Sequence, residues 1–297
     1  MMLGQHECLF LNGKQLAPNG ASSSYFDRGF LLGDGVFETL RYQQGGFPFL
    51  NYHLERLAKG CQRLGIALDI ALLQVELDEF SQVVHRSILQ SDFDGGIVRV
   101  TCTRGVGGRG NYFSADLAPT RVLQFRPANV LGWLQSPVDV VSASHRLSDN
   151  PALAGLKHLS RLDYSLAVER SKPQENQELL LLDSGNCLVE TVHHNIFVKL
   201  GESLLTPTIQ RVGVAGVMRR LVIEGCAVEG LLNVVETDIS LAQLHACDYA
   251  FLTNAAHGIV PIASVDGKGC GRGDTSEIVL IAEEILNTAN SHRVTQS

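Results

Sequence analysis

Glycine is spread along the whole chain, and its distribution constrains the fold more than any other feature. The sequence contains 29 glycines in 297 residues, and many of them stand beside polar turn residues between short apolar runs. An all-helical protein uses fewer, because a glycine inside a helix costs about 0.5–1 kcal/mol relative to alanine. The pattern predicts many strands and turns. Together with several segments of helical apolar spacing, it indicates a mixed α/β (α+β) fold.

The length allows one large domain or two ordinary ones. Prolines bracket a stretch at residues 127–136, and strands and helices are expected on both sides of it. We therefore expect a smaller N-terminal α/β domain at residues 1–126, a linker at 127–136 and a larger C-terminal domain at 137–297.

Local patterns predict individual elements. Asn12-Gly13 between two apolar runs predicts a tight hairpin, because both residues tolerate positive φ angles. Asn51 is expected to cap one helix, and another is expected from Asp69 to about Gln90. The elements expected in the second half include a helix near 158–171, three short strands within 178–205 and a helix after 213–216.

Charge and cysteine usage argue against several classes of protein. The net charge of −7 argues against a protein that binds nucleic acid or an anionic membrane, because both kinds of protein need a basic face. No apolar run approaches the roughly 18–20 residues that span a bilayer. The seven cysteines are scattered and form no Cys-x-x-Cys pair, which supports neither a disulfide framework nor a metal site. We expect a cytoplasmic protein that acts on a small molecule.

Residues 105–110 match the Gly-x-Gly-x-x-Gly pattern of dinucleotide-binding proteins. In those proteins a helix opens at the third glycine, and its amides meet the pyrophosphate. The residues that follow here show no helical apolar stripe. We therefore expect a hairpin or an active-site loop that presents Arg109 and Tyr112.

Lys157 has the most unusual surroundings of the six lysines. Residues 151–156 carry no charge, and Leu159 follows. A lysine that enters an apolar pocket loses solvation, its pKa falls, and its neutral amine acts as a base or forms a Schiff base with an aldehyde cofactor. The alternative is an ordinary lysine at a helix start with its stem buried.

Pyridoxal phosphate is such a cofactor, and it needs a carboxylate at its pyridine nitrogen and donors for its phosphate. Glu190 lies on an apolar strand-like segment, and residues 213–219 read as a glycine-rich loop entering a helix, where free amides suit a phosphate. Each feature also has an ordinary explanation. Glu190 could face solvent on a half-exposed strand, and the glycines could serve helix packing.

Six segments, in order along the chain, carry a resemblance to a known family. They are Phe26–Phe30 with Gly33–Thr39, His53–Leu57, Thr103–Tyr112, Asn150–Leu159, Leu182–Thr191 and Gly213–Arg219. With these segments the chain resembles the class IV pyridoxal-phosphate-dependent aminotransferase superfamily over nearly its whole length, and it is most similar to the aminodeoxychorismate lyase branch. The resemblance implies fold type IV, with two α/β domains, the cofactor in the interdomain cleft, and a homodimer.

The resemblance also implies roles for individual residues. Lys157 matches the lysine that holds the cofactor and moves protons, and Glu190 matches the carboxylate that faces the pyridine nitrogen. The elements that match the phosphate-holding groups are Arg56, the amides of Val217 and Met218, and the loop with Thr253 and Asn254.

The lyase branch converts 4-amino-4-deoxychorismate to 4-aminobenzoate and pyruvate, a step of folate biosynthesis. Thr39 and the arginine-bearing glycine loop favour this reaction, with Lys157 removing the proton at C4 and Thr39 binding substrate or relaying a proton. Ser160 departs from the family, which usually has asparagine there. The residues expected to bind the two substrate carboxylates are Arg28, Arg109 and Arg161, with Tyr112 beside them.

Two other functions remain open. A D-amino-acid or branched-chain transaminase would share every cofactor contact and differ only on the substrate side. A catalytically silent cofactor-binding protein would have no turnover, and the presence of both Lys157 and Glu190 argues against it.

Overall fold

The computed structural model describes residues 6–16, 24–230, 232–271 and 276–294. The chain divides into two compact units. The first extends to Val130 and includes Lys157–Ser160, and the second contains Leu131–Leu156 and Arg161–Val294. A four-residue segment from the middle of the chain therefore belongs to the first unit and not to the unit of its sequence neighbours.

Antiparallel strands form a five-stranded sheet in the first unit, in the order β2-β1-β5-β4-β3. The strands are β1 (Cys8–Leu11), β2 (Lys14–Leu16), β3 (Gly35–Gln43), β4 (Gly95–Thr103) and β5 (Thr120–Ala128). The helices are α1 (Arg28–Leu32), α2 (Leu50–Leu64) and α3 (Ile70–Ile88). In this order β3 is an edge strand, so one of its sides is open to pairing.

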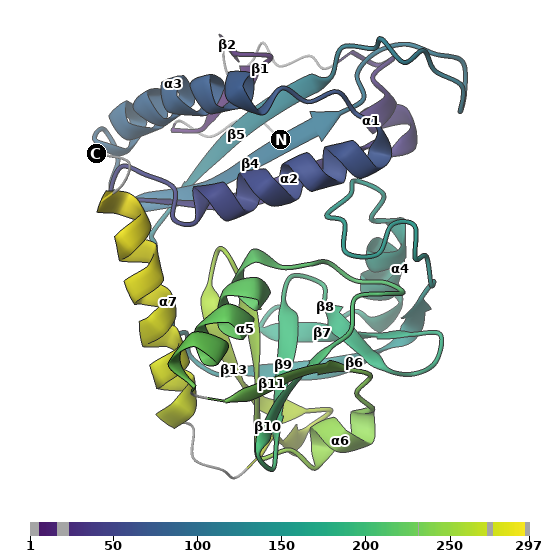
Figure 1. Cartoon of the computed structure of the whole chain (residues 1–297), viewed down its shortest axis with the longest axis vertical. Coiled ribbons are helices and arrows are strands. Elements are labelled where there is room, and N and C mark those ends of the chain that lie inside the picture. The colour runs from purple at the N-terminus through teal and green to yellow at the C-terminus, as the bar shows by residue number, and fades with distance from the viewer. Residues whose placement is uncertain (1–5, 17–23, 231, 272–275, 295–297) are drawn as a thin grey trace. The chain divides into compact units, whose positions relative to one another are not determined.

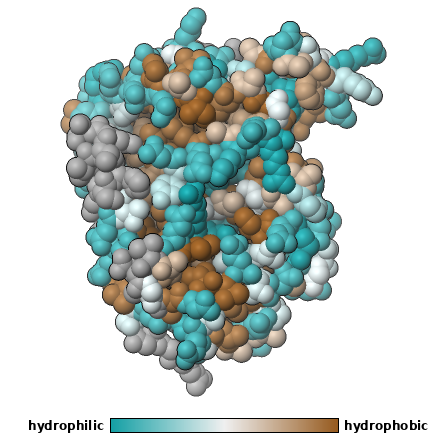
Figure 2. All heavy atoms as spheres, viewed as in Figure 1, coloured by the Kyte–Doolittle hydropathy of each residue, from teal (hydrophilic) through white to brown (hydrophobic). Residues whose placement is uncertain are grey.

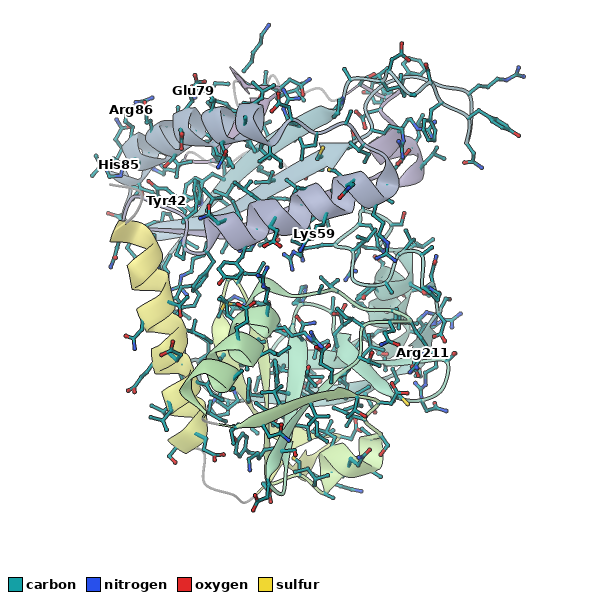
Figure 3. The ribbon with its side chains drawn as sticks, in the orientation of Figure 1. Tyr42, Lys59, Glu79, His85, Arg86 and Arg211 are labelled. Carbon is teal, nitrogen blue, oxygen red and sulfur yellow. The ribbon has the colours of Figure 1, made fainter. Side chains whose placement is uncertain are left out.

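Helices α2 and α3 cover one face of this sheet (Figure 1). Leu57 of α2 and Phe80 of α3 are fully buried and share one core with Leu40 and Phe125 of the sheet. The exposed residues of α3, which include Glu79, His85 and Arg86, lie on its outer side (Figure 3). The helical spacing of apolar residues thus becomes a buried stripe, as expected for amphipathic helices.

The ends of these elements follow from local chemistry. Asn12 and Gly13 have φ angles of 49° and 76°, so the predicted hairpin is confirmed. Asp69 caps α3 by accepting a hydrogen bond from Leu72 N, which agrees with the predicted start of that helix. The prediction that Asn51 caps α2 is wrong, because the helix begins at Leu50 and Phe49, in a left-handed conformation, takes the cap position.

The second unit contains a nine-stranded sheet in the order β11-β10-β9-β12-β13-β6-β7-β8, with β14 beside β13. Its strands are β6 (Val138–Leu147), β7 (Gln177–Asp183), β8 (Leu188–Thr191), β9 (Asn195–Leu200), β10 (Ser203–Pro207), β11 (Asn233–Thr237), β12 (Tyr249–Asn254), β13 (Gly258–Val265) and β14 (Lys268–Gly269). Its helices are α4 (Leu162–Ser171), α5 (Val217–Glu229), α6 (Leu241–His245) and α7 (Ser276–Val294).

Two of the apolar clusters that the described residues form lie in this unit. One joins the middle of the sheet to α6 through residues such as Ile196, Leu252 and Leu244. The other packs α4 against β6 and β7 and includes Ala167 and Leu181. On the molecular face that Figure 2 shows, groups of hydrophobic residues lie between hydrophilic areas.

The second half departs from the sequence prediction in two places. The helix expected near 158–171 begins only at Leu162, because residues 157–159 pair with β3 instead. Four strands, and not three, occupy the region from Gln177 to Pro207. A turn at 201–202 separates β9 from β10, which pair antiparallel.

Ionisable and sulfur-containing residues form no metal cluster within the part of the chain that the structure describes. All seven cysteines are free thiols. None of the described helices is long and apolar enough to cross a membrane.

Candidate active site

Lys157 lies on the open edge of β3. Phe37 N donates a hydrogen bond to Lys157 O at 2.9 Å, and Leu159 N donates to Gly35 O at 2.9 Å. The lysine is half-buried, and its Nζ lies 4.5 Å from the centroid of the Phe37 ring. Backbone pairing therefore fixes the lysine next to the strand that also carries Thr39.

Phe37 and Thr39 share one face of β3, because side chains alternate along a strand. Val36 and Leu40 point into the core on the other face. Thr39 is half-buried and pairs in register with Arg99 of β4. The Arg99 guanidinium lies 3.9 Å from the Phe37 centroid, so two cations flank one aromatic ring. We did not predict Arg99, although its position in an alternating strand gives it this direction.

Arg56 projects from α2 towards Glu38 of β3. Its Nε and Nη2 donate to the two carboxylate oxygens at 2.7 Å and 2.5 Å, and His53 Nδ1 lies 2.7 Å from Oε2. The glutamate and the histidine are fully buried, whereas the Arg56 side chain is 15% exposed. The bidentate contact fixes the plane of the guanidinium.

Electrostatics make this cluster a stable ion pair. Burial raises the pKa of Glu38, but the Arg56 guanidinium and the hydrogen bond with His53 outweigh it and hold the pKa at about 2. Burial lowers the pKa of His53; Glu38 opposes this effect, while the charges of Arg56 and Lys157 add to it. A neutral His53 therefore donates its Nδ1 proton to an ionised Glu38.

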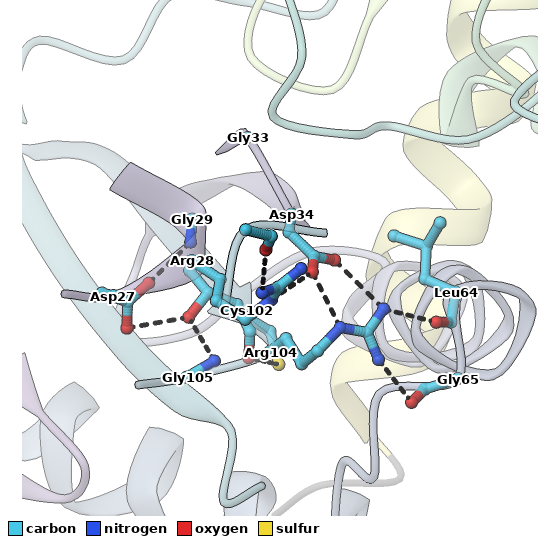
Figure 4. Close-up of polar contacts among 12 residues, drawn as sticks. Asp27, Arg28, Gly29, Gly33, Asp34, Leu64, Gly65, Cys102, Arg104 and Gly105 are labelled. Atoms are coloured by element: carbon cyan, nitrogen blue, oxygen red, sulfur yellow. Dashed lines mark hydrogen bonds and ion pairs between the residues drawn. The ribbon is translucent and has the colours of Figure 1, made fainter. Parts of the chain in front are cut away.

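Arg28 binds Asp34, as Figure 4 shows, and also binds the glycine loop. Its Nε donates to Asp34 Oδ2 at 2.9 Å, and its Nη1 donates to Gly110 O at 2.7 Å. Arg104 binds both oxygens of the same aspartate and the carbonyls of Leu64 and Gly65. Burial raises the pKa of Asp34, but the two arginines outweigh it and lower this pKa below its ordinary value. Arg28 is buried, so its contacts stabilise the loop.

Arg109 and Tyr112 lie at the tip of this loop. Arg109 N donates to Tyr112 O at 2.8 Å, and both side chains are exposed. The next element after the loop is strand β5 and not the helix that a dinucleotide-binding motif requires. Arg109 is therefore the predicted substrate-binding arginine of the first unit that faces solvent.

Glu190, near the end of β8, is a buried carboxylate of the second unit that accepts three hydrogen bonds. Its Oε2 accepts hydrogen bonds from Asn195 Nδ2 at 3.1 Å and Val214 N at 3.0 Å. Its Oε1 accepts a hydrogen bond from Tyr164 OH at 2.5 Å. We did not predict Tyr164 or Asn195, because nothing in the sequence indicates that α4 and β9 bring them to β8.

Arg161 lies above Tyr164. Its guanidinium carbon is 3.2 Å from the ring centroid, and its Nη2 is 4.0 Å from Glu190 Oε1. Burial and the charge of Glu190 raise the pKa of Tyr164 well above its ordinary value. The phenol therefore stays protonated and donates to the carboxylate.

The start of α5 suits a phosphate. The first N–H groups of a helix, here at Val217 and Met218, have no partner within the helix, and the Gly216 cap supplies no side-chain hydrogen bond. A Cβ on Gly216 would overlap Asn195 Oδ1, so only glycine keeps this approach open. Gly213, with a φ of 97°, lies next to Glu190. The turn thus holds the segment that leads into α5 beside the Glu190 carboxylate.

Thr253 and Asn254 end β12. Thr253 is fully buried, and its hydroxyl donates to Gly258 O at 2.9 Å. Asn254 Oδ1 accepts from the backbone N–H groups of Ala256 and His257, which shapes the turn after the strand. These side chains fix the conformation of the loop.

The predicted residues thus fall into two sets. In the first unit, Lys157 and Thr39 flank Phe37, and Arg56 lies on the adjacent helix. In the second unit, Glu190 and Arg161 meet at Tyr164. Ser160, in place of the family's asparagine, donates its hydroxyl to Gly33 O at 3.3 Å in the first unit.

Known proteins resemble the chain over most of its length. Residues 35–265 match the sequence profile of the family described as amino-transferase class IV. A putative branched-chain-amino-acid aminotransferase of Methanocaldococcus jannaschii is 30% identical over 281 residues, which cover 91% of this chain and 92% of that protein. An aminodeoxychorismate lyase of Vibrio harveyi is 31% identical over 243 residues, which cover 80% and 86%.

A solved structure extends this similarity to the fold. The 4-amino-4-deoxychorismate lyase from Pseudomonas aeruginosa aligns with a TM-score of 0.79 and 33% identity, over 93% of this chain and 97% of that chain. The fold is therefore that of the fold type IV pyridoxal-phosphate enzymes, as predicted. With the profile matched over more than half of its residues, the chain belongs to the class IV aminotransferase family, whose members depend on pyridoxal phosphate.

Proposed function

We propose that this protein is a pyridoxal-phosphate-dependent aminodeoxychorismate lyase, which converts 4-amino-4-deoxychorismate to 4-aminobenzoate and pyruvate. The observation that carries the proposal is the position of Thr39, which shares the β3 face of Phe37, the ring beside Lys157 Nζ. A hydroxyl there suits hydrogen bonding to the enolpyruvyl oxygen that leaves. The exposed Arg109 in the glycine loop supports the same substrate.

The chemistry of the donor set fits pyridoxal phosphate. We propose that the N–H groups of Val217 and Met218 and the guanidinium of Arg56 hold the phosphate, and that Glu190 faces the pyridine nitrogen. Two observations support this assignment. The start of α5 has no side-chain cap, and the position of Gly216 has no room for a Cβ.

Lys157 carries the proton transfers in this proposal. Pyridoxal phosphate, when bound, supplies an aldehyde that condenses with amines and a ring that accepts an electron pair. The Lys157 amine would take the proton from C4 of the substrate, and its fixed backbone would supply the proximity that speeds this step. Thr39 donates a hydrogen bond to the departing oxygen, and the loss of the enolpyruvyl group leaves an aromatic ring.

Arginines supply the charge that a dicarboxylate needs. We propose that Arg109 and Arg99, both exposed, bind the two substrate carboxylates. Arg28 acts through the loop, because Asp34 and Gly110 already take its Nε and Nη1. Arg161 lies over Tyr164 in the other set and is the remaining candidate for a carboxylate contact.

A homodimer accompanies this function in our proposal. Aromatic side chains of α1 and its flank stand exposed beside the glycine loop, with Tyr25 78%, Phe30 69% and Tyr112 85% exposed. Arg28 N donates to Gly105 O, which holds the two segments together. Exposed apolar groups of this size mark interaction surfaces. A second copy of the chain would cover them.

A branched-chain or D-amino-acid transaminase is the second candidate, and the 30% identity with the putative branched-chain aminotransferase favours it. Such an enzyme would use the same Lys157 and Glu190 and would return the proton to the cofactor.

The test supplies the reconstituted enzyme with 4-amino-4-deoxychorismate in one assay and with leucine or D-alanine plus 2-oxoglutarate in another. The proposal predicts release of 4-aminobenzoate in the first assay and its loss in a Lys157→Ala variant. Keto-acid formation in the second assay without any aminobenzoate in the first would replace the lyase with the transaminase.

A further inference from the structure

The carboxylate of Glu190 has an unequal distribution of hydrogen bonds. Oε2 accepts two, from Asn195 Nδ2 and Val214 N, whereas Oε1 accepts one, from Tyr164 OH. An ionised carboxylate has about four acceptor positions, two on each oxygen. Among the described residues, three of these positions are therefore filled, and the fourth lies on Oε1 next to the phenol.

The surroundings of this carboxylate strengthen every contact it makes. Glu190 is 4% and Tyr164 7% exposed, so the hydrogen bond between them lies in a medium of low dielectric constant. Arg161 covers the Tyr164 ring and places Nη2 4.0 Å from Oε1, too far for a hydrogen bond but close enough for Coulomb attraction. The phenol, the amide and the backbone N–H donate hydrogen bonds to the carboxylate, and the guanidinium attracts it.

We propose that Tyr164 is a positioning residue that shares Glu190 Oε1 with the pyridine nitrogen of the bound cofactor and keeps the proton on that nitrogen. This inference rests on the cofactor assignment of the proposed function, but not on the choice between lyase and transaminase. A proton between a carboxylate and a pyridine has two locations. Donors to the carboxylate stabilise the charged pair, in which the ring holds the proton, over the neutral pair. Removal of the phenol moves the proton towards Glu190.

The experiment measures the location of that proton directly. Wild type and a Tyr164→Phe variant are reconstituted with pyridoxal phosphate labelled with ¹⁵N in the ring, and the ¹⁵N chemical shift is recorded at neutral pH. Glu190→Gln provides the reference for an unprotonated ring. Tyr249→Phe is the matched control, because Tyr249 is also buried and also donates to a carboxylate, that of Glu277, at 2.8 Å.

We expect the wild type and Tyr249→Phe to show the shift of a protonated ring and Tyr164→Phe to move towards the Glu190→Gln value. Turnover of Tyr164→Phe should fall about tenfold in kcat with little change in KM, because the ring withdraws electrons less strongly without its proton. A Tyr164→Phe shift equal to that of the wild type overturns the inference, even if turnover falls.

Failure of the proposed function gives a different result. A wild-type protein that takes up no pyridoxal phosphate refutes the cofactor assignment, and the inference falls with it. A wild-type protein that binds the cofactor but transaminates refutes only the lyase, and the ¹⁵N shifts still decide the role of Tyr164. A misfolded Tyr164→Phe protein is recognised by its circular dichroism, and Arg161→Gln, which removes the guanidinium at 4.0 Å, then takes its place and should move the shift in the same direction by less.

Discussion

A Glu38→Gln substitution tests whether the buried cluster on α2 and β3 holds Arg56 in place. The pKa of Glu38 falls from 4.5 to about 2, which corresponds to about 3 kcal/mol of stability at pH 7. A lowered pKa means that this stability is complete well above pH 4.5 and is lost as the pH falls towards 2. By pH 3.5 it amounts to about 2 kcal/mol.

Amide hydrogen exchange of β3 and α2 measures the effect within the first unit. We expect the variant to lower their opening free energy by about 3 kcal/mol at pH 7 and by a smaller amount at pH 3.5. The released guanidinium should also raise the Kd for pyridoxal phosphate about tenfold, the cost of one charge-assisted hydrogen bond.

Glu76→Gln is the matched control for this experiment. Glu76 is a buried carboxylate of the same unit, bound bidentately by Arg121 at 2.8 Å and 2.7 Å, but it does not contact Arg56. It should cost stability without changing the Kd for the cofactor. A Glu38→Gln variant that loses less than about 1 kcal/mol, or whose loss does not change with pH, would refute the reasoning.

Substitutions at three further positions address the site. Thr39→Val should lower kcat about 100-fold with little change in KM, and Thr39→Ser should restore most of it, as steady-state release of 4-aminobenzoate will show. Arg109→Ala should raise KM tenfold or more while the Kd for cofactor stays constant; an unchanged KM would remove Arg109 from the substrate site. Gly216→Ala should weaken cofactor binding about tenfold in an equilibrium titration, because its Cβ overlaps Asn195 Oδ1, and unaltered affinity would argue against a phosphate at this helix start.

Local patterns predicted most of the elements of the first unit. The Asn12-Gly13 hairpin and the Asp69 cap depend on residues close in sequence, and both are confirmed. The predicted start of the helix after Lys157 was wrong, because a long-range pairing of residues 157–159 with the edge of β3 overrides the local helical pattern. The spacing of apolar residues within the segment gives no sign of such a pairing.

The same limit applies to the candidate site. Lys157 and Glu190 stand out in the sequence because their neighbours are apolar or follow a turn. Tyr164 and Arg99 do not stand out, since a tyrosine on a helix and an arginine on a strand have many ordinary positions. What distinguishes them is a tertiary contact: the Tyr164 phenol donates a hydrogen bond to Glu190, and the Arg99 guanidinium lies over the Phe37 ring. Arg28 does stand out in the sequence, where its motif predicted a contact with substrate. In the structure its hydrogen-bond partners are Asp34 and Gly110.

The stoichiometry of the reaction tests the central claim most directly. Purified, cofactor-loaded protein is mixed with an excess of 4-amino-4-deoxychorismate in the absence of any other amino or keto acid, and 4-aminobenzoate and pyruvate are counted per active site. A lyase releases both in equal amounts over many turnovers, which is the result we predict. A reaction that yields no aminobenzoate, or that stops after one equivalent with the cofactor aminated, would contradict the account.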